Sequence, residues 1–111
     1  MEKFNEIING DKPVLVDFYA TWCGPCRMMH PILDELKKSV GESAHIIKLD
    51  IDNKANEQLV QQFNVRSVPT LIIFHKGDMK WRQSGVVNAY KLETMLRQYG
   101  EEEIPEAVKQ E

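Results

Sequence analysis

The chain contains only two cysteines, Cys23 and Cys26, with two residues between them. Sulfurs this close along the chain can form one reversible disulfide, but they cannot join distant parts of a fold. The CGPC segment follows an apolar, β-branched run and precedes a helical pattern, so a helix is expected to begin there. A helix N-terminus stabilises a thiolate, the form of cysteine that attacks disulfides. The pair predicts thiol–disulfide exchange, with Cys23 as nucleophile and the more buried Cys26 as resolving cysteine.

The two intervening residues suit a turn into a helix. Gly24 is expected to permit a tight turn, and Pro25 has a helix-compatible φ and lacks an N–H where none is needed. A CxxC sequence is also half of a zinc site, so metal binding is an alternative. Zinc needs four ligands, and the other candidates, His30, His45 and His75, lie on different predicted elements. The spacing therefore favours redox chemistry, and no metal site is predicted.

A carboxylate and a tryptophan accompany the cysteine pair. Asp17 interrupts the apolar run at residues 14–20, where an unpaired carboxylate is costly to bury or titrates above its usual range. It is either a strand-end side chain that faces water or a buried proton acceptor beneath the CGPC turn. Lys48, halfway along the next strand, is its plausible partner. Trp22 directly precedes the motif, as a core residue or as a wall for an incoming peptide.

The elements that must position these residues follow from hydrophobic periodicity. Helices are predicted over residues 2–9, from 23 or 24 to 40, over 53–64 and over 87–99, and strands over 13–20, 45–51, 70–74 and 79–84. The long helix between the first two strands makes them parallel, with a right-handed crossover. The HKGD turn makes the last two strands antiparallel. This order predicts an α/β fold with a mixed central sheet and helices on both faces.

Composition limits the size and the class of the protein. With 111 residues, 42% apolar and 28% charged, the chain fits one globular domain over residues 1–100. The net charge of −3 argues against nucleic-acid binding, and no apolar run approaches the roughly 20 residues that span a membrane. Residues 101–111 hold five Glu and one Lys, and we assign this acidic C-terminal tail no function.

The first ten residues, MEKFNEIING, contain no apolar signal-peptide region. A cytoplasmic location is therefore expected. An exported chain whose signal peptide had been removed would have the same sequence.

Three segments, VDFYATWCGPCRMMHPILDEL, KLDID and FNVRSVPTLIIF, closely resemble the thioredoxin family. The resemblance covers about residues 3–100 and implies the thioredoxin fold. Only sixteen residues precede Asp17, too few for the N-terminal edge strand that many members have. We therefore expect four strands in the order 2-1-3-4, or five if that strand is present. The resemblance also implies a protein-disulfide reductase in which Asp17, beside Lys48, is the acid and base that serves Cys26.

The resemblance implies a substrate site as well. Pro69 would follow a cis peptide bond and face the cysteines, and the Val68 backbone would pair with an extended substrate segment. The apolar docking surface would be lined by Trp22, Gly24, Pro25, Ile51, Ser67, Gly85 and Val86. Ser67 stands where the family often has glycine, which could alter the substrate groove.

The resemblance also names partners. A monomer would reduce diverse disulfide-containing target proteins, and an NADPH-dependent thioredoxin reductase would restore its dithiol. The chain itself has no glycine-rich dinucleotide motif, so no bound cofactor is expected beyond the Cys23–Cys26 disulfide. Neither nucleic acid nor a membrane is expected as a partner.

Other functions remain open on the sequence. The same chemistry serves exported disulfide oxidases and isomerases, although Gly-Pro between the cysteines resembles reducing members more than isomerases, which often carry Gly-His. A non-redox binding module would use the surface around Trp22, Pro69 and Gly85 to hold a partner. A metal site shared across a dimer is a further alternative.

Overall fold

The computed structural model describes residues 2–101, so the predicted tail lies outside the described residues except for Glu101. One sheet contains four strands in the order β2-β1-β3-β4. The strands are β1 (Val14–Tyr19), β2 (His45–Asp50), β3 (Thr70–His75) and β4 (Asp78–Ser84). β1 pairs parallel with β2 and antiparallel with β3, and β3 pairs antiparallel with β4. The predicted mixed sheet and its strand order are confirmed, and residues 2–101 contain no fifth strand.

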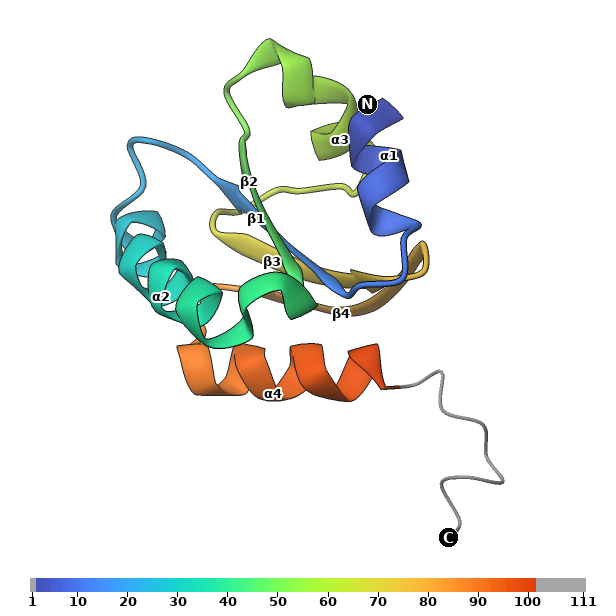
Figure 1. Cartoon of the computed structure of the whole chain (residues 1–111). Helices are drawn as coiled ribbons and strands as arrows, with labels where there is room; N and C mark the ends of the chain where they lie inside the picture. Colours follow the sequence, from blue (N-terminus) through green and yellow to red (C-terminus); the bar gives the residue numbers. More distant parts are fainter. Residues whose placement is uncertain (1, 102–111) are drawn as a thin grey trace, which may run out of the picture.

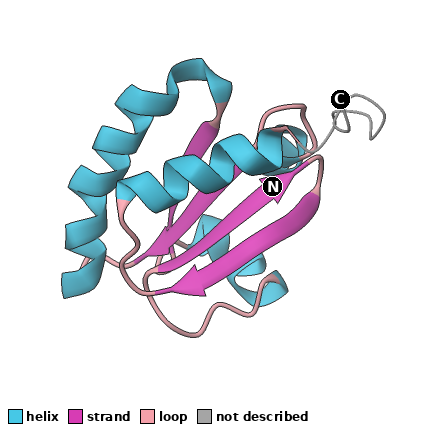
Figure 2. Ribbon diagram, turned by 90° about the horizontal axis from the view of Figure 1, so that it is seen from below, coloured by secondary structure: helices cyan, strands magenta, loops and turns pink. Residues whose placement is uncertain are grey.

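Helices cover both faces of this sheet (Figure 1). The α-helices are α1 (Glu2–Ile8), α2 (Gly24–Val40), α3 (Glu57–Gln62) and α4 (Ala89–Gly100), and two 3-10 turns are η1 (Gly41–Ser43) and η2 (Lys54–Asn56). Figure 2 shows α2 and α4, the two long helices, lying across one face of the sheet. α1 and α3 pack on the other face.

The helix predicted over residues 53–64 is wrong in its first turn. Asn53 Oδ1 accepts a hydrogen bond from the Ala55 N–H, and Asn56 Nδ2 donates to the Asp50 carbonyl. These bonds hold the turn after β2 in the 3-10 form of η2, and the α-helix begins only at Glu57. Asn64 ends the segment with φ 51°, as expected for a residue that tolerates a left-handed conformation.

The sheet separates two hydrophobic cores. Successive strand side chains point to opposite faces, so Val14, Val16 and Phe18 pack toward α1 and α3 while Leu15 packs toward α2 and α4. Asp17 shares the face of Leu15 and therefore points toward α2. The residues of β1 and β3, the two central strands, are buried, except for Tyr19, which is partly exposed.

Strand direction brings three distant segments to one end of the sheet. β1 ends at Tyr19 and leads into α2, while the antiparallel β3 begins at the same end, with Phe18 opposite Thr70. β4 ends there too, with Ser84 opposite Thr70. The topology therefore places the CGPC turn, the Val68–Pro69 turn and Gly85 side by side.

No helix in the part of the chain that the structure describes is long and apolar enough to cross a membrane.

We expect Leu33→Ala to lower the free energy of unfolding by about 2–5 kcal/mol, because it leaves a cavity between α2 and the sheet. Leu33 is 1% exposed and belongs to the α2–α4 core. Urea unfolding of the oxidised protein measures the change. Glu35→Ala, an exposed position on the same helix, is the matched control and should change the free energy by less than about 0.5 kcal/mol. Equal losses for the two variants would contradict the role assigned to this core.

Candidate active site

The two cysteines lie at the start of α2, directly after β1. They form a disulfide, with their Cα atoms 5.2 Å apart. Cys23 is the N-cap residue of the helix, and its Sγ accepts a hydrogen bond of 3.2 Å from the Cys26 N–H. That N–H is one of the donors that a helix N-terminus leaves unpaired. After reduction, the same group can stabilise a negative charge on the Cys23 sulfur.

The two cysteines differ only slightly in their exposure to solvent. Cys26 is fully buried, and Cys23 is 5% exposed. Both pack with Ala20 in a small cluster that Tyr19, Ile51 and Val68 complete. Access from solvent therefore favours Cys23, as the sequence predicts.

Gly24 occupies the first position of α2, and Pro25 occupies the second. The prediction for Pro25 is confirmed, because its missing N–H falls within the first helical turn. The reason given for Gly24 is wrong. Its φ is not positive, and a Cβ atom added there would meet nothing within 4 Å. The turn itself does not need glycine.

The Val68–Pro69 turn faces the disulfide. Its peptide bond is cis, and the Val68 carbonyl oxygen lies 3.6 Å from Cys23 Sγ. Pro69 is buried, whereas Ser67 is exposed at the rim. Gly85, at φ 96°, donates its N–H to the Pro69 carbonyl at 2.9 Å, so a glycine is needed there for its backbone conformation.

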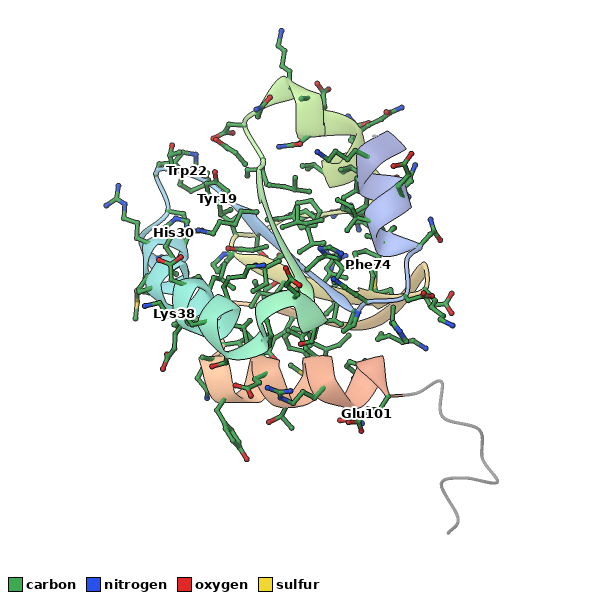
Figure 3. All side chains as sticks on the ribbon, viewed as in Figure 1. Tyr19, Trp22, His30, Lys38, Phe74 and Glu101 are labelled. Carbon is green, nitrogen blue, oxygen red and sulfur yellow. A yellow bond between two sulfur atoms is a disulfide. The ribbon has the colours of Figure 1, made fainter. Side chains whose placement is uncertain are left out.

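Apolar side chains surround this turn without covering it. Trp22 is 66% exposed and Val86 is 38% exposed, while Ile51 is partly buried against the cysteines. Figure 3 shows Trp22 at the same end of the molecule as Tyr19 and His30. Trp22 is therefore a surface side chain, so the core interpretation is wrong, and its role as a wall for a peptide stays a prediction.

Trp22 has a partner that sequence reasoning missed. Its indole Nε1 donates a hydrogen bond of 2.9 Å to Asp52 Oδ2. The two residues are thirty positions apart, and no spacing rule links them. Only the pairing of β1 with β2, which carries the chain past β2 to the same end of the sheet, brings them together.

Asp17 is buried at 0% exposure in the middle of β1. Neither carboxylate oxygen has a hydrogen-bonding partner among the described residues. Burial raises the pKa of Asp17 from 3.8 to about 6, although the positive charge of Lys48 lowers that pKa in part. Lys48 is the register partner of Asp17 on β2 and is itself exposed. The structure thus brings the predicted pair together, on the face of the sheet that packs against α2.

The histidines are not grouped for metal binding. His30 is half-buried, with its ring edge-to-face with Tyr19 at 5.4 Å, and His75 Nε2 lies 3.0 Å from the Asp11 carbonyl. Within residues 2–101, no three or more His, Cys, Asp or Glu side chains are close enough to hold one ion. His30 lies outside the small cluster of Ala20, Cys23 and Cys26.

This arrangement defines a class of protein. A CxxC disulfide at a helix N-terminus, with the Val68–Pro69 turn opposite it and a buried carboxyl in the preceding strand, can pass two electrons between a dithiol and a disulfide. The protein is a dithiol–disulfide oxidoreductase, an enzyme that acts through thiol–disulfide exchange.

Comparison with known proteins supplies the family. The thioredoxin family model matches residues 1–98. A thioredoxin of Porphyra purpurea is 40% identical over 94 residues, which cover 85% of this chain and 86% of the relative. One of Alicyclobacillus acidocaldarius is 49% identical over 74 residues, which cover 67% of this chain and 69% of the relative. The chain belongs to the thioredoxin family.

Solved structures agree with that assignment. A mutant thioredoxin from Halobacterium salinarum superposes with a TM-score of 0.79 at 31% identity, over 90% of this chain and 85% of that one. Malassezia sympodialis thioredoxin gives a TM-score of 0.75 at 31% identity, over 89% and 84%. Members of the family act on disulfide-containing targets through a redox-active disulfide without a prosthetic group.

We expect Asp17→Asn to stabilise the oxidised protein at about pH 8 by up to about 3 kcal/mol, because the buried carboxylate is removed. Below pH 3.8 the Asp17 carboxyl carries its proton in both the folded and the unfolded state. Between pH 3.8 and about 6 the unfolded state releases that proton first, so the free energy of unfolding falls as the pH rises. Urea unfolding at several pH values measures the difference, which should vanish near pH 3.

Lys48→Met provides the second arm of this experiment. Loss of the lysine charge should raise the pKa of Asp17 further and extend the loss of stability to higher pH. A stability gap between wild type and Asp17→Asn that stays constant with pH would contradict a buried, titrating carboxyl.

Proposed function

We propose that this protein is a general protein-disulfide reductase, a single domain over residues 1–100 in which Cys23 is the nucleophile and Cys26 the resolving cysteine. The observation that carries the proposal is the hydrogen bond from the Cys26 N–H to Cys23 Sγ at the start of α2. It favours the thiolate on Cys23 over that on the fully buried Cys26.

The reaction proceeds in two exchanges. The Cys23 thiolate attacks one sulfur of the target disulfide, which forms a Cys23–target disulfide and releases the other target sulfur as a thiolate that takes up a proton. The Cys26 thiolate then attacks Cys23 Sγ. This step forms the Cys23–Cys26 disulfide and releases the second target sulfur, which is protonated in turn. Two electrons pass from the enzyme dithiol to the target.

Asp17 serves the second exchange. Cys26 must lose its proton before it attacks, and the base that we assign is the Asp17 carboxylate, which is buried in β1, the strand that leads into the cysteine turn. Its pKa of about 6 keeps it largely ionised near neutral pH while leaving it able to accept a proton. Lys48 lowers that pKa and so keeps the base available.

The target is held as an extended segment against the Val68 backbone. The apolar docking surface formed by Trp22, Gly24, Pro25, Ile51, Ser67, Gly85 and Val86, together with Pro69, then takes its side chains. Trp22 and Val86 offer exposed apolar side chains, and backbone pairing does not depend on the target's side chains, so the surface suits many sequences rather than one. We further propose that the protein acts as a cytoplasmic monomer and that an NADPH-dependent thioredoxin reductase restores the dithiol.

The direct test is the reduction of insulin by dithiothreitol with and without the protein. The rate is measured from the turbidity that the released B chain produces. We expect a clear acceleration by catalytic amounts of wild type. Cys23→Ser is the control and should give the uncatalysed rate. Absence of acceleration by wild type would reject the proposal.

The two cysteine roles are tested by trapping. We expect Cys26→Ser to accumulate a mixed disulfide with insulin, because Cys23 attacks but nothing displaces it. Cys23→Ser should accumulate none, because Cys26 is fully buried. Non-reducing electrophoresis with mass spectrometry detects the adduct. The reverse pattern would exchange the two roles.

A further inference from the structure

Three hydroxyl groups join the Val68–Pro69 turn to the end of β4. Ser67 Oγ donates to Ser84 Oγ at 3.1 Å, Ser84 Oγ lies 3.1 Å from Thr70 Oγ1, and Thr70 Oγ1 donates to the Ser67 carbonyl at 2.7 Å. We call this closed set, Ser67, Thr70 and Ser84, the hydroxyl ring. It begins and ends on Ser67, so it links the two residues that flank the turn to each other and to the end of β4.

The direction of each hydrogen bond in the ring is determined. A hydroxyl has one proton to donate, and Thr70 gives its proton to the Ser67 carbonyl. Thr70 must therefore accept from Ser84, which in turn accepts from Ser67. All three bonds run the same way around the ring, the arrangement in which neighbouring hydrogen bonds strengthen one another.

Ser84 is the member of the ring that lies outside the turn. Ser67 and Thr70 flank Val68 and Pro69, whereas Ser84 comes from β4, opposite Thr70 in the sheet register. The adjacent Gly85 N–H bonds to the Pro69 carbonyl at 2.9 Å. The turn is thus fixed to β4 by one backbone bond and by the two side-chain bonds of Ser84.

We propose that Ser84 is a positioning residue for the exchange reaction. Through the hydroxyl ring it fixes the Val68 peptide groups, whose carbonyl lies 3.6 Å from Cys23 Sγ, in the orientation that pairs with a peptide substrate. This inference rests on the proposed function, because it assumes that the target lies along Val68. Ser84 itself need not touch the target or the reacting sulfurs.

The test compares a protein disulfide with a disulfide that has no peptide groups. Second-order rate constants of the reduced protein are measured with insulin and with hydroxyethyl disulfide, and their ratio is the readout. We expect Ser84→Ala to lower the insulin to hydroxyethyl disulfide ratio about fivefold, the effect of roughly 1 kcal/mol of lost hydrogen bonding. Ser84→Thr keeps the hydroxyl and should restore the ratio.

Ser43→Ala is the matched control. Ser43 Oγ also donates to a backbone carbonyl, that of Val40 at 2.6 Å, but it lies beyond the far end of α2, about 25 Å of helix away from Cys23. Its loss should leave the ratio at the wild-type value.

A double-mutant cycle separates positioning from independent effects. If Ser67 and Ser84 act through one ring, Ser84→Ala should lower the ratio much less in a Ser67→Ala background than in wild type. Independent effects would multiply and overturn the proposal, as would an unchanged ratio for Ser84→Ala or a failure of Ser84→Thr to restore it. If the wild-type protein does not reduce insulin, the proposed function fails. If the wild-type protein reduces insulin and Ser84→Ala has the same ratio as wild type, only the positioning role fails.

Discussion

The start of α2 is the constraint on which the rest of the structure depends. At most helix starts a serine, threonine or aspartate oxygen accepts the first free N–H, but here a sulfur takes that position. The contact that caps the helix and the contact that would stabilise a Cys23 thiolate in the proposed reaction are therefore the same hydrogen bond. β1 ends at Tyr19, shortly before α2 begins, and its burial between the two cores fixes the position of the helix start. One atom, Cys23 Sγ, both caps the helix and belongs to the redox-active disulfide.

Asp17 shows the opposite balance. Neither oxygen of its carboxyl has a hydrogen-bonding partner within residues 2–101, and burial raises its pKa to about 6. A strand with an apolar residue at this position would be more stable at neutral pH. The proposed reaction gives this carboxyl the task of accepting the proton of Cys26. The unfavourable burial and the chemical use have the same cause, the low polarity beneath α2.

Much of this molecule could be predicted from its sequence, because the strongest signals are local. The CGPC turn and the four strands follow from spacing and periodicity, and the structure places them as expected. For Asp17 the residues alone left a buried and a water-facing position open, and the structure shows the buried one. The start of α3 could not be predicted, because side-chain bonds from Asn53 and Asn56 override the helical pattern. The hydrogen bond from Trp22 to Asp52 and the hydroxyl ring also could not be predicted from the sequence. Each joins residues that meet only when strands pair, so no short-range pattern encodes them.

In the described sheet β2 is at the edge, and its outer row of backbone donors and acceptors has no strand beside it. Such a row is a template on which another chain can extend the sheet and begin to aggregate. The strand is short, and the exposed Lys48 stands in its second half. Bringing two such strands together would force like charges into close approach and strip water from an ammonium group. The lysine that moderates the carboxyl in the interior thus also discourages fibre-like growth at the margin.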